Sequence, residues 1–153
     1  MSDSNQIIIE LEHVKGLEFS VKFDLGSTDE PPEKRLSIGG GAGPSATRLL
    51  TAAAANCLAA SLLYCVAKNA PPAGSLRTSA VCTLSRNEKG RQRIGNIAVT
   101  LEVSSELEQA ARMNRCLNVY EDFSLAAASL REGFPIDVRV VNDQGVTLQQ
   151  SGG

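Results

Sequence analysis

The chain has 153 residues, of which 42% are hydrophobic, and this is enough for one globular domain with a hydrophobic core. Its net charge of -2 gives no global attraction to nucleic acid or to an anionic membrane, so we expect neither as a partner. The first residues lack the basic and apolar regions of a secretory signal peptide, which makes the cytoplasm the expected location.

The cysteines are too far apart to indicate a metal site. There are four of them, with no CxxC pair, and His13 is the single histidine. Zinc sites use closely spaced Cys and His ligands, so we expect no metal, and nothing in the sequence indicates another cofactor. In a protein that is not secreted, structural disulfides are not expected either. We therefore interpret three of the four as small core residues: Cys65, Cys82 and Cys116.

The N-terminal part of the chain predicts a β-hairpin followed by a long loop. Residues 6–13 and 17–23 have the alternation of two strands, joined by a turn at Gly16. Residues 25–43 are polar and rich in Gly and Pro, with three consecutive glycines at residues 39–41. A loop this long is either functional or a plain connector, and the sequence leaves both interpretations open.

Residues 44–68 predict a long central helix, with Ser45 as its N-cap and a stop after Lys68. Only Arg48 is charged between these two ends, and the helix has no clearly polar face. Such a helix is buried on most sides, which in a chain this short requires covering layers or a second subunit. It is long enough to cross a bilayer, but its Ala, Asn, Ser and Thr content favours a soluble core helix over a membrane span. Cys57, near its middle, is where we look for chemistry.

The remainder predicts a second hairpin, helices and a third hairpin. Residues 76–84 and 95–103 form the second hairpin, whose tip carries four cations that we interpret as solvated, with an anion site as the alternative. One helix is expected from Ser104 through Leu117 and another over 120–131, followed by strands over 134–140 and up to 148, with fraying from Gln149. Hairpin connections indicate an antiparallel α+β protein. We expect a single domain over 1–153, divided into segments 6–43, 44–70, 75–103, 104–132 and 134–149.

This order of elements, with a cysteine in the centre of an Ala-rich helix after a Gly-rich loop, resembles the OsmC/Ohr family. The resemblance covers essentially the whole chain and rests on three segments, GAGPSATRLLTAAAANCLAASLLYC, SRNEKGRQRIGNIAV and CLNVYEDFSLAAASLREGFPIDVRV. It implies antiparallel sheets wrapped around long central helices in an intertwined homodimer. It also implies a cytoplasmic oxidoreductase of the peroxide response, a thiol peroxidase acting on organic hydroperoxides.

The resemblance places the reactive cysteine at Cys57 and also marks departures from the family. Family members have a second cysteine where this chain has Ser124, and a carboxylate where it has Thr47. An arginine of the preceding loop activates the thiol in the family, and Arg35 is the best candidate here, with Arg48 second. The chain is thus a divergent member, in which an external thiol reductant would have to resolve oxidised Cys57.

Two hypotheses follow. In the first, Cys57 reduces a small organic hydroperoxide, with Arg35 as activator and Thr47 and Ser124 in the binding site. In the second, the protein is a catalytically degenerate dimer that binds a small hydrophobic ligand at the subunit interface. We expect Cys57 to lie close to Ser124, whose hydroxyl either donates a hydrogen bond to the sulfur or caps the helix that begins near Leu125.

Overall fold

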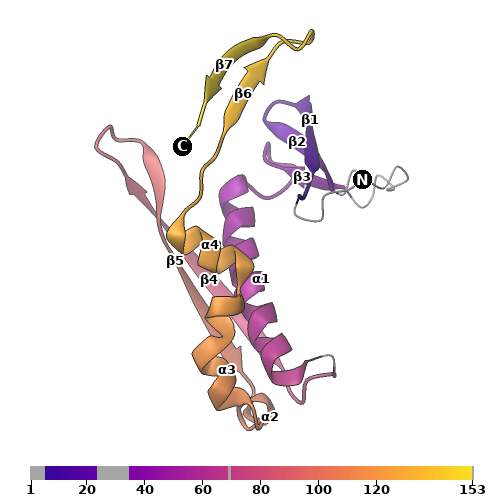
Figure 1. The fold of residues 1–153 in the computed structure, drawn as a ribbon, viewed down its shortest axis with the longest axis vertical. Helices are drawn as coiled ribbons and strands as arrows, with labels where there is room; N and C mark the ends of the chain where they lie inside the picture. Colours follow the sequence, from indigo (N-terminus) through magenta and orange to yellow (C-terminus); the bar gives the residue numbers. More distant parts are fainter. Residues whose placement is uncertain (1–5, 24–34, 69, 153) are drawn as a thin grey trace. The chain divides into compact units, whose positions relative to one another are not determined.

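The computed structural model describes residues 6–23, 35–68 and 70–152 (Figure 1). They fall into two compact units, which we describe separately. One unit consists of Met1–Ala52 and Thr83–Gly95, and the other of Ala53–Cys82 and Asn96–Gly153. The single-domain organisation expected from the sequence stays a prediction.

The first unit contains a three-stranded antiparallel sheet in the order β1-β2-β3, formed by Ile9–Lys15, Glu18–Phe23 and Leu36–Ile38. The predicted hairpin is confirmed, with Leu11 opposite Val21. Gly16 forms the turn with a positive φ of 53°, and the His13 ring donates a hydrogen bond to the Gly16 carbonyl. Of the predicted loop, residues 25–34 lie outside the described residues. The prediction of a loop is wrong for residues 36–38, because they pair with β2 as a strand.

The glycines after β3 are required by close backbone approaches. Gly39 and Gly40 have positive φ angles, and a Cβ on either would lie less than 3 Å from backbone atoms of Leu17 or Glu18. Because only glycine fits both the conformation and the space, this turn can fold back over the β1–β2 hairpin and lead into the central helix.

The predicted central helix is confirmed as α1, Ala46–Ala67. Ser45 caps it, since its Oγ accepts the Arg48 N–H, and Lys68 ends it in the left-handed conformation. Within one chain it is not buried on most sides, contrary to expectation. A stripe of small and apolar residues stays exposed: Ala46, Leu50, Ala53, Ala60 and Tyr64. Among the described residues, α1 is the one helix whose length and composition would allow a membrane span.

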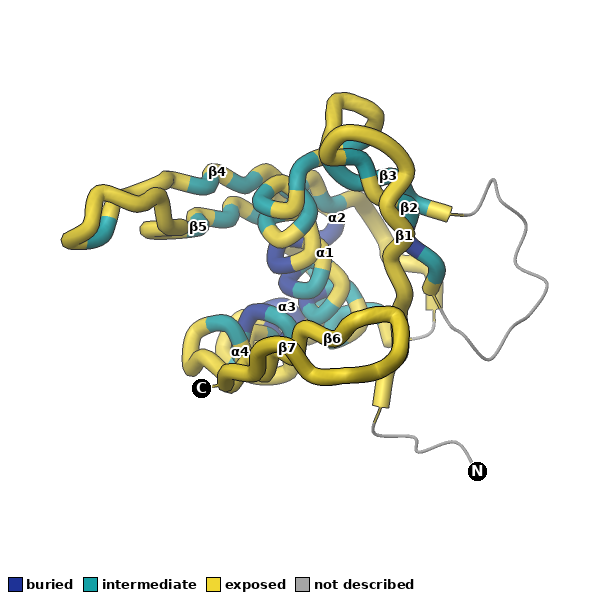
Figure 2. Tube along the Cα trace, turned by 90° about the horizontal axis from the view of Figure 1, so that it is seen from above, coloured by how far each residue is buried: buried dark blue, intermediate teal, exposed yellow. Residues whose placement is uncertain are grey.

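The second unit packs the C-terminal half of α1 against short helices and the base of a hairpin, whose tip, Thr83–Gly95, belongs to the first unit. The hairpin strands β4 and β5 are Leu76–Arg86 and Gln92–Val103, longer at the tip than predicted, and the helical elements are α2 (Ser105–Glu108), α3 (Met113–Val119), η2 (Tyr120–Phe123) and α4 (Leu125–Glu132). The buried residues Leu62, Leu107, Met113 and Cys116 form the core, and Figure 2 shows the buried positions gathered on α1 and the helices beside it. The cations at the hairpin tip are exposed, and two of them, Arg86 and Arg93, donate to local backbone carbonyls.

The predicted helix from Ser104 to Leu117 is wrong in one respect, because it is two short helices separated at residues 109–112. Ser104 caps α2 by accepting the Leu107 N–H, and the same Oγ accepts the Ser75 N–H, which fixes the start of α2 to the segment before β4. The second predicted helix is also divided: η2 ends before Ser124, and α4 begins after it.

The C-terminal hairpin pairs β6, Val138–Val141, with β7, Thr147–Ser151, around a turn at Asn142–Gly145. Two expectations are corrected here. The first strand begins at Val138 and not near Phe134, and the chain is not frayed from Gln149, because Gln149 and Gln150 pair with Val140 and Arg139. Both strands are exposed along their length (Figure 2).

Candidate functional site

The centre of the candidate site is the point where Cys57 of α1 meets the N-terminus of α4. The backbone N–H of Ala126 donates to Cys57 Sγ at 3.4 Å. Ala126 lies in the first turn of α4, where the N–H groups have no partner inside the helix. The half-buried thiol therefore occupies the position at which a helix N-terminus favours an anion.

Ser124 is the second component of the site. It occupies the N-cap position of α4, and its side chain is fully buried, but it makes no capping hydrogen bond. Among the described residues its Oγ has no hydrogen-bond partner of ordinary geometry, yet its hydroxyl is the largest influence on the Cys57 thiol. Both observations fit a hydroxyl that lies beside the sulfur without an ordinary hydrogen bond to it. The expected capping hydrogen bond is not formed. Ser124 does lie close to Cys57, as expected.

These donors lower the pKa of the Cys57 thiol from its ordinary value. The Ser124 hydroxyl contributes most and the Ala126 N–H next, followed by the N–H groups of Ala127 and Leu125, while burial acts in the opposite direction. Hydrogen bonds to the thiolate stabilise the charged form, which is why they lower the pKa. Within the described part of the chain, no charged side chain contributes to this shift.

Cys57 opens into a cleft of about 540 Å³ that runs along α1. The helical spacing of Cys57, Ser61, Tyr64 and Lys68 places them on one side of the helix. The amine of Lys68 lies over the Tyr64 ring, 5.5 Å from its centroid. The cleft is lined by Asn56, Cys57, Ala60, Ser61, Tyr64, Cys65, Lys68 and Phe123. It is mostly apolar, with the thiol towards one end and a cation at the other.

Cys65 and Cys116 form a disulfide that joins α1 to α3. This corrects the interpretation of both as separate core thiols in a protein without disulfides. Their 51-residue separation gave no sequence signal, because a pair so far apart is recognised only once the helices are seen to pack together. Cys57 and Cys82 are both free and half-buried.

No protein-family model and no curated protein matches the sequence. Solved structures do match. A hypothetical protein from Aquifex aeolicus superposes with a TM-score of 0.63 at 14% identity, over 84% of this chain and 89% of that one. An OsmC-like protein of unknown function from Vibrio cholerae superposes with a TM-score of 0.60 at 15% identity, over 84% of this chain and 94% of that one. The fold is OsmC-like. At these identities the likeness shows the fold alone.

The OsmC-like fold brings two of the four residues predicted for the site together, Cys57 and Ser124. Thr47 lies in the first turn of α1, where its carbonyl accepts a hydrogen bond from the Thr51 hydroxyl. It belongs to the first unit, as does Arg35. Their parts in a site with Cys57 stay predictions, and so do the roles predicted for Cys57 and Ser124.

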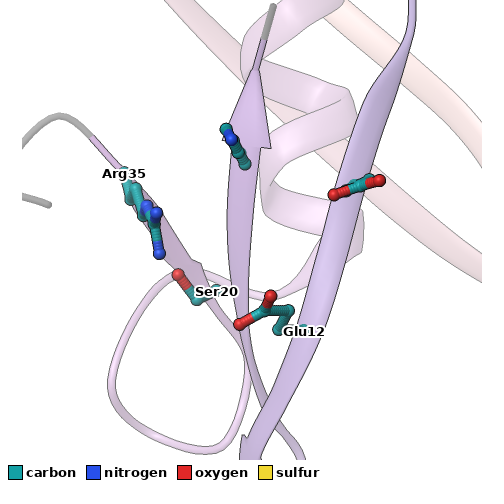
Figure 3. A pocket seen from close by; sticks show the side chains of 5 residues that line it. Glu12, Ser20 and Arg35 are labelled. Atoms are coloured by element: carbon teal, nitrogen blue, oxygen red, sulfur yellow. The ribbon is translucent and has the colours of Figure 1, made fainter. Parts of the chain in front are cut away.

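Arg35 precedes β3 and lies over the three-stranded sheet of the OsmC-like fold, near Ser20 and Glu12 (Figure 3). With Glu10 and Lys22, these residues line a small recess of about 70 Å³, which has room for a few water molecules. The alternative activator, Arg48, points its guanidinium at the hydroxyl of Ser45.

Sequence reasoning missed the N–H groups of α4 as donors to the thiol. The residue types from Leu125 to Ala127 do not indicate this role, because every residue except proline has the same backbone N–H donor. It also missed Lys68 and Phe123 as cleft residues. The helical spacing of Tyr64 and Lys68 from Cys57 was the available signal for one end of the cleft.

Proposed function

We propose that this OsmC-like chain is a thiol protein that reduces small organic hydroperoxides through Cys57, with an external thiol as resolver. The observation that carries the proposal is the setting of Cys57, which faces the Ala126 N–H and the buried Ser124 hydroxyl at the start of α4. A thiolate is the nucleophile in such a reaction, and these donors increase its population at neutral pH.

In the first step, the Cys57 thiolate attacks the terminal oxygen of the hydroperoxide. An S–O bond forms, the O–O bond breaks, and the alkoxide takes a proton and leaves as an alcohol. Cys57 becomes a sulfenic acid, two electrons having passed from sulfur to the peroxide. The same α4 donors stabilise the negative charge on sulfur before attack.

Resolution needs a thiol from outside the chain. Cys65 is eight residues further along α1, about 12 Å along the helix axis, and it is already bonded to Cys116. An external thiol condenses with the sulfenic acid, releasing water and leaving a mixed disulfide at Cys57. A second thiol then displaces Cys57 as a thiolate and restores it.

The proposal includes a cytoplasmic homodimer. The exposed stripe of α1 is small and apolar, and its N-terminal part, from Ala46 to Ala53, allows close approach of a second helix of the same kind, while Ala60 and Tyr64 line the cleft. Many large apolar side chains are also exposed in one chain, among them Ile7, Leu17, Leu125 and Leu148. Large exposed apolar surfaces of this kind are typical of protein interfaces. Arg35 of the first unit is the alternative activator of Cys57 in this proposal, and the ionic-strength dependence of the thiol distinguishes it from the α4 donors.

The cleft favours a second candidate function, a noncatalytic dimer that binds a small hydrophobic ligand. Its lining is mostly apolar, with Tyr64 and Phe123 as the large surfaces, and its volume lies in the range of small-molecule sites. In this case the thiol would be part of the wall and would not react.

Intact-mass measurement after stoichiometric cumene hydroperoxide separates the two functions. The first predicts a gain of about 16 Da at Cys57, or a mixed disulfide when a small thiol is present. The matched control is Cys57→Ser, and free Cys82 serves as an internal comparison in the same sample. An unchanged mass, with cumene hydroperoxide or its alcohol retained in native mass spectra, would support the binding function instead.

A further inference from the structure

The disulfide is not an isolated core feature, because it opens onto the same cleft as Cys57. Cys116 is 1% exposed and packs in the core with Leu62, Leu107 and Met113. Cys65 is half-buried and lines the cleft. A reagent that enters the cleft therefore meets Cys65, while Cys116 is enclosed by the core.

The disulfide also holds the segment that supplies the donors of Cys57. This segment, residues 113–132, runs from α3 through η2 into α4. It is attached to α1 covalently at Cys65–Cys116 and by the Ala126 N–H at Cys57. The two attachments are ten residues apart on the segment and eight residues apart on α1. Releasing the covalent one leaves the start of α4 held by apolar packing and a single hydrogen bond to sulfur.

We propose that Cys65–Cys116 is a second redox site, a disulfide that a dithiol reductant opens through Cys65, and that its redox state sets how firmly the start of α4 is held against Cys57. The first half of the proposal is independent of peroxide chemistry. The second half rests on the proposed function in so far as it makes the reactivity of Cys57 the property under control.

The reduction is an ordinary thiol–disulfide exchange. A thiolate of the reductant attacks Cys65 Sγ, the bond between the two cysteines breaks, and its electron pair leaves on Cys116, which takes a proton. The second thiol of the reductant then attacks the mixed disulfide. Cys65 is released as a thiol, and the reductant leaves as its own disulfide. Two electrons and two protons have passed to the protein.

Loss of the tether weakens the donor arrangement at Cys57, and in the wild type it also releases Cys65 as a thiol in the same cleft. Tyr64 and Lys68 share the cleft with Cys57, while Glu121 and Arg131 pair with each other on η2 and α4. None of these side chains contributes to the ionisation of Cys57. A change that the reduced wild type shares with Cys65→Ser/Cys116→Ser, which adds no thiol to the cleft, therefore reports the positions of the donors.

The first measurement asks whether the bond forms. The air-oxidised protein is alkylated under denaturing conditions, digested and mapped by mass spectrometry. We expect a linked pair of peptides containing Cys65 and Cys116, and its loss in dithiothreitol. Recovery of both cysteines as alkylated thiols from the oxidised protein would overturn the proposal.

The second measurement follows the pH dependence of iodoacetamide labelling at Cys57, resolved from the other cysteines. It compares three samples: the oxidised protein, the same protein after reduction and desalting, and Cys65→Ser/Cys116→Ser. We expect the labelling rate of Cys57 at pH 7 to fall about threefold for each half unit by which its pKa rises on loss of the disulfide. Labelling of Cys82 should not change, which shows that the fold persists.

The reduced wild type keeps the test valid if the double variant does not fold. An unchanged Cys57 profile after reduction would overturn the inference. If peroxide reduction fails while the profile still shifts, the inference stands and the proposed function falls. If peroxide is reduced and the profile does not shift, the proposed function stands and the inference falls.

Discussion

At the scale of single residues, the unusual feature of Cys57 is that its pKa is lowered by neutral donors. A hydroxyl and three backbone N–H groups favour the thiolate, without a contribution from a charged side chain in the described residues. Short-range hydrogen bonds are not screened by salt, whereas the attraction of an exposed guanidinium is. The ionic-strength dependence of the thiol therefore distinguishes its activators.

Raising the salt concentration is the first prediction. We expect the pH midpoint of Cys57 labelling to stay nearly constant between about 0.01 and 1 M salt, a range over which the Debye length falls from about 30 to 3 Å. Site-resolved alkylation of the wild type measures it. A midpoint that rises clearly with salt, and no longer does so in Arg35→Gln, would show that Arg35 activates the thiol.

The second prediction concerns the replacement of Ser124. Because the hydroxyl is the main cause of the lowered pKa, Ser124→Ala should raise the labelling midpoint of Cys57 and lower its rate at pH 7. In the wild type these donors hold the pKa of Cys57 below its ordinary value. Thermal stability should stay the same or increase, because a buried hydroxyl without an ordinary partner is removed.

Ser129→Ala, on the exposed face of α4, is the matched control and should leave the labelling of Cys57 unchanged. A marked loss of stability in Ser124→Ala would contradict the assignment, because it would mean that the hydroxyl makes a strong structural hydrogen bond.

At the scale of elements, the helices show what sequence could and could not predict. The ends of α1 follow from Ser45 and Lys68, and the hairpins follow from alternation and turn residues. Strand β3 was not predictable, because three residues become a strand only by pairing with β2. The sequence predicted one helix over 120–131, and a helix start near Leu125 entered only as one alternative for Ser124. The use of α4 as a donor to Cys57 depends on contact between two helices whose contacting residues lie 69 positions apart in the sequence.

The cap of α2 gives the third prediction. The Ser104 hydroxyl accepts hydrogen bonds from the N–H groups of Leu107 and Ser75. Ser104→Ala therefore removes the acceptor of both hydrogen bonds. We expect a loss of about 1 kcal/mol in the free energy of unfolding, at the usual scale for an N-cap. Urea unfolding measures it. The neighbouring exposed Ser105→Ala should change little, and an equal effect of the two substitutions would contradict the capping role.

At the scale of the whole molecule, the contrast between the composition of α1 and its exposure is the main fact. A helix without a polar face was expected to be covered, and one chain leaves the stripe from Ala46 to Tyr64 open. The composition of α1 indicates that the helix needs a cover, but the pattern of one helix does not specify the geometry of the surface that covers it. A second copy is our proposal for it.

The fourth prediction tests that cover. Analytical ultracentrifugation of the wild type should give about twice the chain mass of 16.2 kDa. Ala53→Arg places a large cation in the stripe and should give a monomer or a misassembled species, because a charge buried in an apolar interface is strongly unfavourable. The same substitution at exposed Ala111, outside α1, is the control. A wild type that sediments as a monomer would contradict the dimer.

The covalent link between α1 and α3 encloses the whole β4–β5 hairpin, including its exposed tip with Arg86, Lys89 and Arg91. A brief trypsin nick at this tip would cut the polypeptide but leave the fragments attached to each other. On a gel, the nicked protein should migrate as one band without reductant and as two bands with it. A pair of bands in both lanes would mean that the Cys65–Cys116 disulfide is absent. A simple electrophoresis experiment therefore reports the oxidation state of this cysteine pair.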